Sequence, residues 1–145
     1  MDDVVTIARA ELGSSVSIDA DRLAAIDTEP GAWLTGGRDQ QQSYYSPLEQ
    51  INRGNVSRLG FAWQYEVDTE HGFEATPIVV DGVLYTSGAG GAVYAVDAAT
   101  GAEKWKFEPV LDPDFMRKAC CGVVNRGVAV WRGLVYVGTL DGYLY

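Results

Sequence analysis

Short apolar runs separated by glycine-containing turns dominate the chain from residue 76 onward. Residues 76–88 contain two short runs rich in valine and tyrosine on either side of Asp81-Gly82, and a third run at residues 91–94 follows a glycine-rich turn. β-Branched and aromatic residues favour strands, and Asp-Gly favours the tight turn of a β-hairpin. The pattern therefore predicts a meander of antiparallel strands.

The same pattern returns at an offset of 51 positions. Residues 76–88 correspond to residues 127–139, with a glycine and a tyrosine at matching places, and residues 91–94 correspond to residues 142–145. Internal repeats of this length are typical of arrays such as propellers, in which each unit buries its faces against its neighbours.

The third run of the first unit leads through a turn into a fourth strand that carries Trp105. Four strands in a unit of this length suggest a propeller blade. Trp63, which follows residues 55–62, fits a degenerate copy of the fourth strand. The second unit reaches Tyr145 before its own tryptophan strand, so we expect a fragment of a longer protein that stops within a blade.

Residues 1–32 have a different pattern. Residues 4–12 and 19–26 show spacing compatible with helices, Asp19 is a candidate N-cap, and residues 28–31 indicate a stop and turn. We therefore expect an all-β fold in which residues 1–32 form a short helical N-terminal segment and residues 33–145 form a partial propeller of about two blades.

Composition narrows the classes of partner. The chain has 20 acidic and 11 basic residues and a formal net charge of −9, which is opposite in sign to the basic surface that attracts phosphate backbones and anionic lipids. No run approaches the roughly 20 apolar residues that span a bilayer, and residues 1–3 do not begin a signal peptide. We therefore expect neither a nucleic-acid partner nor a transmembrane segment.

Cys120 and Cys121 are the only cysteines and are adjacent. Consecutive Cα atoms lie about 3.8 Å apart, below the roughly 4.4–6.8 Å usual for a disulfide, so bridging them requires a strained ring. From the residues alone, two reduced and buried thiols are favoured, and the strained bridge stays open as the alternative, because such strain is tolerated at functional sites.

The repeat also brings polar residues together. Glu74 shifted by 51 positions falls on Asn125, next to Arg126. Equivalent positions of neighbouring blades face the same place around the central channel, so we predict that Glu74, Asn125 and Arg126 converge at one mouth of that channel. His71 is the only histidine, without a second one for a histidine-based metal site, and is interpreted as a solvated loop residue.

Three stretches resemble the quinoprotein alcohol dehydrogenases, which are eight-bladed β-propellers. Ala95-x-Asp97-x-x-Thr100-Gly101-x-x-x-Trp105 matches the tryptophan-docking motif of the quinoprotein propellers, and residues 45–52 and 120–127 resemble the alcohol dehydrogenase branch. The resemblance covers roughly residues 31–145, about a quarter of a family member's usual length. One departure is Gly122, a position that is commonly acidic in this branch, which puts the local loop conformation in question.

The resemblance implies a cofactor, pyrroloquinoline quinone (PQQ), and assigns residues to it. In the family the adjacent cysteines form a vicinal disulfide against the PQQ ring, so a Cys120–Cys121 disulfide and an oxidising compartment, the periplasm, are implied. The residues that match Glu74 and Arg126 contact the cofactor, since a guanidinium suits the carboxylates of PQQ. Asn125 is a further candidate for cofactor binding.

The resemblance also implies a reaction, the oxidation of primary alcohols to aldehydes, with electrons passed to a cytochrome c or a quinone. Ca²⁺ or a lanthanide polarises the quinone in the family. The metal ligands and the catalytic aspartate come from later blades, so this chain supplies no catalytic or metal-ligating residue. No Cys-x-x-Cys-His occurs, so any haem c belongs to a later domain.

Two other classes of protein share the repeat. One is a non-catalytic propeller that acts as a binding scaffold in outer-membrane protein assembly, and the other is a PQQ-dependent sugar dehydrogenase. The scaffold has no use for adjacent cysteines, and the sugar dehydrogenases generally lack them. The cysteine pair therefore favours the alcohol dehydrogenase.

Overall fold

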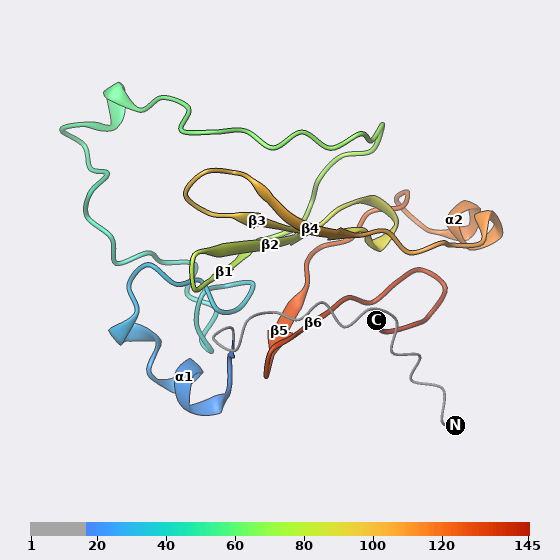
Figure 1. The fold of residues 1–145 in the computed structure, drawn as a ribbon, viewed down its shortest axis with the longest axis horizontal. Helices are drawn as coiled ribbons and strands as arrows, with labels where there is room; N and C mark the ends of the chain where they lie inside the picture. The colour runs from blue at the N-terminus through green and yellow to red at the C-terminus, as the bar shows by residue number, and fades with distance from the viewer. Residues whose placement is uncertain (1–16) are drawn as a thin grey trace.

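A four-stranded antiparallel sheet lies at the centre of the computed structural model, which describes residues 17–145 (Figure 1). Its strands pair in chain order, and they are β1 (Ile78–Val80), β2 (Val83–Ser87), β3 (Val93–Asp97) and β4 (Glu103–Phe107). The meander predicted from the sequence is therefore confirmed, including its fourth strand.

The second repeat unit reproduces the first at the predicted offset. Strands β5 (Ala129–Trp131) and β6 (Leu134–Tyr136) form a hairpin whose start matches that of β1 and β2 shifted by 51 positions. The third run of this unit is held by paired backbone hydrogen bonds of 2.9 Å between Val137 and Tyr145, the counterpart of the Thr86–Tyr94 pairing in the first sheet.

The two hairpin turns have the same backbone conformation. Asp81 and Gly82 have φ of 51° and 75°, and Arg132 and Gly133 have φ of 48° and 79°. Two consecutive positive φ values characterise the type I′ turn, which matches the twist of the strands it joins. The Asp-Gly and Arg-Gly pairs thus fix the same turn in both units.

The N-terminal part of the described chain is helical, as predicted. Helix α1 (Ala20–Ala24) begins after Asp19, whose carboxylate accepts a 2.9 Å hydrogen bond from the Arg22 N–H, so the predicted N-cap is confirmed. A 3₁₀ turn, η1 (Ile26–Thr28), follows and replaces the end of the expected helix. The helix expected over residues 4–12 lies outside the described residues.

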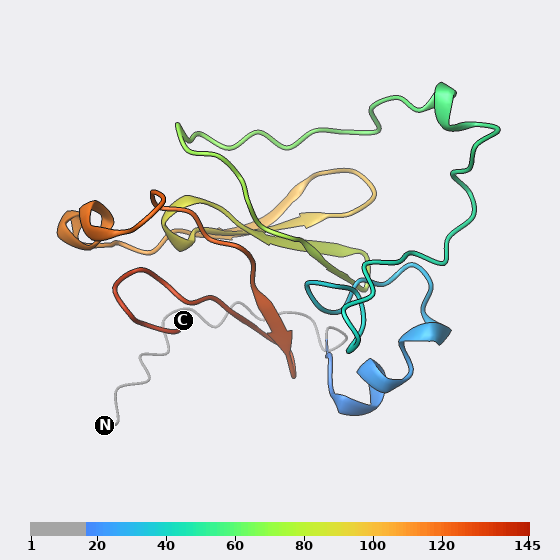
Figure 2. The ribbon, with the colours of Figure 1, turned by 180° about the vertical axis from the view of Figure 1, so that it is seen from behind.

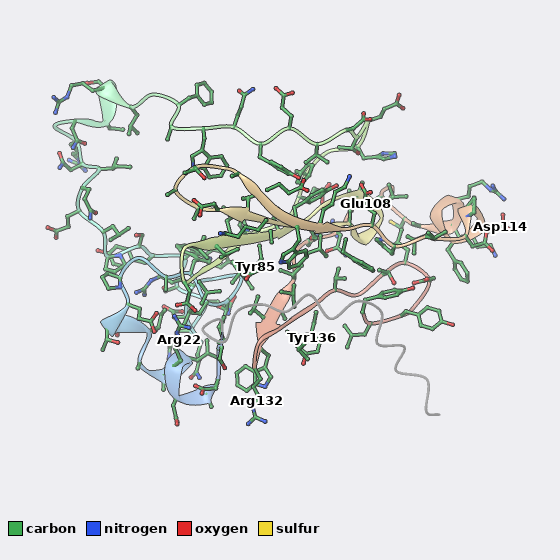
Figure 3. All side chains as sticks on the ribbon, viewed as in Figure 1. Arg22, Tyr85, Glu108, Asp114, Arg132 and Tyr136 are labelled. Carbon is green, nitrogen blue, oxygen red and sulfur yellow. The ribbon has the colours of Figure 1, made fainter. Side chains whose placement is uncertain are left out.

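Arg22 fastens this helical part to the first sheet. Its guanidinium donates to Glu29 at 2.8 and 2.7 Å and to Asp81, in the β1–β2 turn, at 3.0 and 2.7 Å. Figure 3 shows Arg22 between α1 and the near end of the sheet. Bidentate pairs of this kind are the stronger class of charged hydrogen bond, so Arg22 fixes the path by which the chain enters the propeller.

The central sheet is covered on both faces, as the view from behind shows (Figure 2). One face packs against the helical part and the β5–β6 hairpin, and residues 61–77 run across the other. The buried core between the sheet and the hairpin side contains Ile18, Ile26, Leu34, Ile78, Val80, Val83, Tyr85, Ala95 and Val130. The first blade is therefore enclosed by the chain that precedes it and the chain that follows it.

Trp63 makes the contact expected of a docking tryptophan. Its indole Nε1 donates a 3.1 Å hydrogen bond to the carbonyl of Ala98, and its ring lies so close to Gly101 that a Cβ there would be 2.5 Å from Cε3. Residues 61–67 form no regular strand. Trp63 thus packs on the turn between β3 and β4, although the copy of the fourth strand expected around it does not form a regular strand.

The connections carry little regular structure. The segment from residue 35 to residue 77 contains one 3₁₀ turn, η2 (Val56–Arg58), and the β2–β3 connection contains η3 (Ala89–Gly91). Helix α2 (Pro113–Lys118), which the sequence pattern did not predict, lies between β4 and β5. No helix in the described part of the chain has the length and apolar character to cross a bilayer.

Candidate functional site

Glu74 and Arg126 meet at the end of the central sheet where β1 begins. The Nη2 atom of Arg126 lies 3.1 Å from Oε2 of Glu74, and 45% of the Glu74 side chain and 70% of the Arg126 side chain stay exposed. The two residues precede equivalent first strands of neighbouring units. Their predicted convergence is confirmed, and their exposure leaves both open to a ligand.

Backbone hydrogen bonds hold the Arg126 loop against the first unit. The Thr76 N–H donates to the carbonyl of Arg126 at 3.3 Å, and the Gly90 N–H donates to the carbonyl of Val123 at 2.7 Å. Val123 is buried, with 6% exposure. The loop is therefore anchored on both sides of Asn125, and the position of the Arg126 side chain follows from these anchors.

Asn125 points away from the Glu74–Arg126 pair. Its Oδ1 accepts hydrogen bonds from Ser87 Oγ at 2.7 Å and from the Gly127 N–H at 3.1 Å, and its Nδ2 donates to the carbonyl of Gly138 at 2.8 Å. The amide thus joins the end of β2 to the chain after β6. This geometry gives Asn125 a structural role, so the predicted convergence holds for Glu74 and Arg126 but not for the Asn125 amide, whose contact with a cofactor stays a prediction.

Ser87 is a residue that the sequence analysis missed. It is fully buried, and its hydroxyl depends on Asn125. The signal was present in the repeat, because Ser87 shifted by 51 positions falls on Gly138, and Asn125 binds both of these equivalent positions. The 51-residue offset therefore identifies polar groups that meet between two units, provided that it is used to compare the ends of the strands as well as their starts.

Cys120 and Cys121 lie on the surface of the same loop. Both are exposed thiols in this structure, and their Sγ atoms are 2.7 Å apart. The burial expected for two reduced thiols is not found, and the disulfide stays a prediction.

Cys121 has an unusual backbone and a perturbed thiol. Its φ is 66°, in the left-handed region that residues with a Cβ rarely adopt, and Gly122 follows with φ of 84°. The Cys120 contact, followed by partial desolvation, raises the pKa of the Cys121 thiol, while the positive charge of Arg126 opposes the rise. Cys120 and Cys121 lie on the loop that leads to Arg126.

This group of side chains fits a flat anionic heterocycle such as PQQ. The Arg126 guanidinium is largely exposed and uses Nη2 toward Glu74, so its fork is accessible to a ligand carboxylate. The Glu74 carboxylate offers an acceptor, and the exposed sulfurs offer a polarisable surface to a ring. In residues 17–145, no three His, Cys, Asp or Glu side chains come together in a way that could hold a metal ion.

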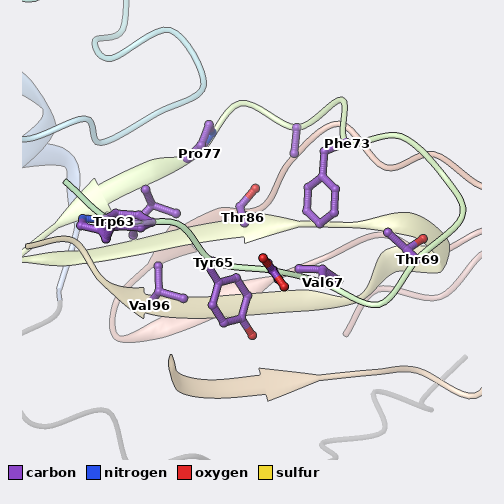
Figure 4. Close-up of a pocket in the computed structure, with 11 residues that line it drawn as sticks. Trp63, Tyr65, Val67, Thr69, Phe73, Pro77, Thr86 and Val96 are labelled. Atoms are coloured by element: carbon purple, nitrogen blue, oxygen red, sulfur yellow. The ribbon is translucent and has the colours of Figure 1, made fainter. Parts of the chain in front are cut away.

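A pocket of about 680 Å³ lies elsewhere, between residues 63–77 and one face of the central sheet (Figure 4). Its walls are mainly apolar and aromatic, and they include Trp63, Tyr65, Phe73 and Leu84. None of the residues predicted for the cofactor site lines it. The pocket is therefore part of the packing between the units rather than part of the candidate site.

Comparison with known proteins identifies relatives over nearly the whole described chain. Residues 33–145 match the family described as PQQ: glucose/ethanol/alcohol dehydrogenase, β-propeller domain. The chain is 52% identical over 128 residues to the quinohemoprotein alcohol dehydrogenase ADH-IIG of Pseudomonas putida, and these residues cover 88% of the chain and 18% of that protein. It is 45% identical over 139 residues to the dehydrogenase subunit of an alcohol dehydrogenase (quinone) of Komagataeibacter europaeus, covering 96% of the chain and 18% of that subunit.

Solved structures show the same fold. The structure of the Pseudomonas putida enzyme ADHIIG superposes with a TM-score of 0.88 at 52% identity, covering 91% of the chain and 19% of that structure. A europium-containing methanol dehydrogenase superposes with a TM-score of 0.78 at 38% identity, covering 86% of the chain and 22% of that structure. The chain thus spans about a fifth of the length of these relatives, and its predicted β-propeller fold is confirmed.

Proposed function

The chain belongs to the PQQ β-propeller family of glucose, ethanol and alcohol dehydrogenases, and on this premise we propose that it forms one wall of the cofactor site of an enzyme that oxidises primary alcohols to aldehydes. The observation that carries the proposal is the ion pair of Glu74 and Arg126 at one end of the first blade, with Cys120 and Cys121 exposed on the loop that leads to Arg126.

Each of these groups has a distinct part in binding. Arg126 donates to a carboxylate of PQQ, Glu74 orients the guanidinium and accepts a hydrogen bond from the cofactor, and the cysteine pair covers a face of the ring after closing to a vicinal disulfide. The Asn125 amide holds the loop that presents Arg126. When bound, PQQ supplies the electron acceptor for the alcohol.

The remaining parts of the proposed enzyme come from outside this chain. They are Ca²⁺ or a lanthanide with its ligands, the catalytic base, and a cytochrome c or quinone that receives the electrons, with haem c in a later domain as one form of that acceptor. The oxidising periplasm is the proposed location, because a vicinal disulfide persists there. The names of the relatives support the alcohol as substrate class, and the europium-containing neighbour supports a metal.

Cofactor binding to the full-length gene product tests the proposal. Arg126→Ala removes a charge-assisted hydrogen bond worth about 1.5–3 kcal/mol, so we expect PQQ to bind roughly 10- to 100-fold more weakly in a fluorescence titration. Arg132→Ala, at the exposed turn of the β5–β6 hairpin, is the matched control and should bind PQQ normally.

Two further measurements complete the test. Dye reduction with ethanol should require PQQ together with Ca²⁺ or a lanthanide. Mass spectrometry of the peptide that contains Cys120 and Cys121 should show the loss of two hydrogens relative to the dithiol. A protein that binds no PQQ and reduces no dye under these conditions would instead be a non-catalytic propeller.

A further inference from the structure

Three aromatic rings form a continuous row that starts beside the candidate site. The rings of Phe73 and Tyr94 have centroids 6.1 Å apart, and those of Tyr94 and Tyr65 have centroids 5.8 Å apart in an edge-to-face arrangement. Phe73 directly precedes Glu74 in the chain. Figure 4 shows Phe73 and Tyr65 on the same side of the sheet.

Gly88 makes this row possible. A Cβ at this position would lie 2.9 Å from Cε2 of Tyr94 and 3.2 Å from Cζ of Phe73, so both rings lie against the bare backbone at the end of β2. Tyr94 is buried, with 5% exposure, whereas Tyr65 is half-buried. The row therefore runs from the Glu74 end of the blade, through a buried ring, to a ring at the surface.

The outer ring carries its own proton acceptor. The Tyr65 hydroxyl donates a hydrogen bond to Oε2 of Glu103, at the start of β4. Desolvation, followed by this hydrogen bond and the negative charge of Glu103, raises the pKa of Tyr65 to about 12. The phenol is therefore protonated at neutral pH, and its proton has a carboxylate within hydrogen-bond reach, which is the geometry that proton transfer requires.

We propose that Tyr65 is an oxidisable residue that donates an electron through the rings of Tyr94 and Phe73 to a one-electron oxidant at the Glu74 end of the blade, while Glu103 takes the phenolic proton. A peroxyl radical is an oxidant of the required class. Such a path moves the oxidising equivalent from the Glu74 end of the blade to the Tyr65 phenol.

The step is balanced in atoms and electrons. The oxidant gains one electron, so that a peroxyl radical becomes a peroxide anion, which then takes a proton from water. The Tyr65 O–H bond breaks, its proton forms a bond to the Glu103 carboxylate, and the ring is left as a neutral phenoxyl radical. Tyr94 and Phe73 serve as the bridge and end the step unchanged, so the Tyr94 hydroxyl has no part in it.

A photo-oxidant bound to His71 supplies the test. His71 is the only histidine of this chain and lies two residues before Phe73, so a ruthenium polypyridyl complex coordinated to it generates a one-electron oxidant at the Glu74 end. The full-length gene product is labelled, flashed in the presence of an electron-accepting quencher, and followed by transient absorption and electron paramagnetic resonance. His71→Gln identifies the signal that depends on this label.

We expect a tyrosyl radical in the labelled protein. His71→Gln and Tyr65→Phe should abolish this radical, and Glu103→Gln should slow its formation. Tyr94→Phe keeps the bridging ring and should leave the rate unchanged, whereas Tyr94→Leu should lower it. Tyr45→Phe, at an exposed tyrosine outside the row, is the matched control. An undiminished label-dependent radical in Tyr65→Phe, or equal rates in Tyr94→Leu and Tyr94→Phe, overturns the proposal. No bound PQQ is needed, so the result is independent of the proposed dehydrogenase activity.

Discussion

Substitution of Gly101 by alanine measures how strongly Trp63 fixes one unit to the next. Gly101 has φ of +73°, and a Cβ added to it would lie 2.5 Å from Cε3 of Trp63 and 2.7 Å from Cδ2. The indole is held by its hydrogen bond to Ala98, so it cannot move aside without losing that bond. Alanine at this position therefore meets both a backbone penalty and a collision with a fixed ring.

Gly82 provides the matched control. Its φ is +75°, nearly the same as that of Gly101, but no atom lies within 4 Å of an added Cβ. Gly82→Ala should therefore lower the free energy of unfolding by only about 1–2 kcal/mol, the cost of the left-handed backbone conformation for a residue with a Cβ. Gly101→Ala should lower the free energy of unfolding by about 1–3 kcal/mol more, because the added Cβ overpacks against Trp63. The difference between the two variants is the quantity that the structure predicts.

The assay is urea-induced unfolding of the full-length gene product, followed by tryptophan fluorescence. The larger shift of the midpoint should belong to Gly101→Ala. In a double-mutant cycle with Trp63→Ala the collision is absent, so the cost of Gly101→Ala should fall to that of Gly82→Ala. Equal shifts for the two glycines, or a cost at Gly101 that does not depend on Trp63, would refute the docking contact.

Three further predictions concern the groups that hold the blade together. Arg22 keeps the pKa of the Glu29 carboxylate below its usual value of 4.5. A carboxylate whose pKa is lowered by folding stabilises the fold above its unfolded pKa, and this stabilisation is lost as the pH falls through its folded pKa. As the pH is lowered from about 4.5, the melting temperature should therefore decrease, and it should decrease less steeply in Arg22→Gln. Identical acid profiles would contradict this. Asn125→Ala leaves the buried Ser87 hydroxyl unpaired and should destabilise the protein by about 1–3 kcal/mol in urea unfolding, and Asn125→Asp, which keeps the acceptor for Ser87 but sets a carboxylate oxygen against the Gly138 carbonyl, should not restore the stability. Tyr85→Phe removes a buried hydroxyl without a hydrogen-bond partner in the described structure, so thermal unfolding should show no loss of stability, and a clear loss would indicate a partner for that hydroxyl.

The strands could be predicted from the sequence because the repeat contains the same pattern of apolar and turn residues twice. Shifting β1 by 51 positions gives β5 to the residue, and the two-residue turns after them adopt the same positive φ values. Both features depend on which face a residue occupies along a strand, and that property is periodic. The same shift takes Glu74 to Asn125 and so places Arg126 beside the expected meeting point, but it does not indicate which of these two side chains pairs with Glu74.

The connections were harder to predict because their conformation depends on single contacts. The orientation of Asn125 is determined by a hydroxyl and a carbonyl on two different units, and no local pattern signals that choice. Helix α2 had a local signal, since Pro113 is its first residue and the preceding Asp112 accepts a hydrogen bond from the Asp114 N–H. Its short length left no apolar periodicity to detect.

The connection from β4 to β5 is where the candidate site departs from the repeat. It contains helix α2, both cysteines and Arg126, and nothing at these positions in the first unit corresponds to them. Four hydrogen bonds tie it to the two units, namely those of the Val123 and Arg126 carbonyls with Gly90 and Thr76, and those of the Asn125 amide with Ser87 and Gly138. These anchors use backbone groups and the Asn125 amide, and the exposed side chains of Cys120, Cys121 and Arg126 are not among them. Substitutions of Cys120, Cys121 and Arg126 should therefore change ligand binding while leaving the blade folded, whereas substitutions at the anchors should impair both.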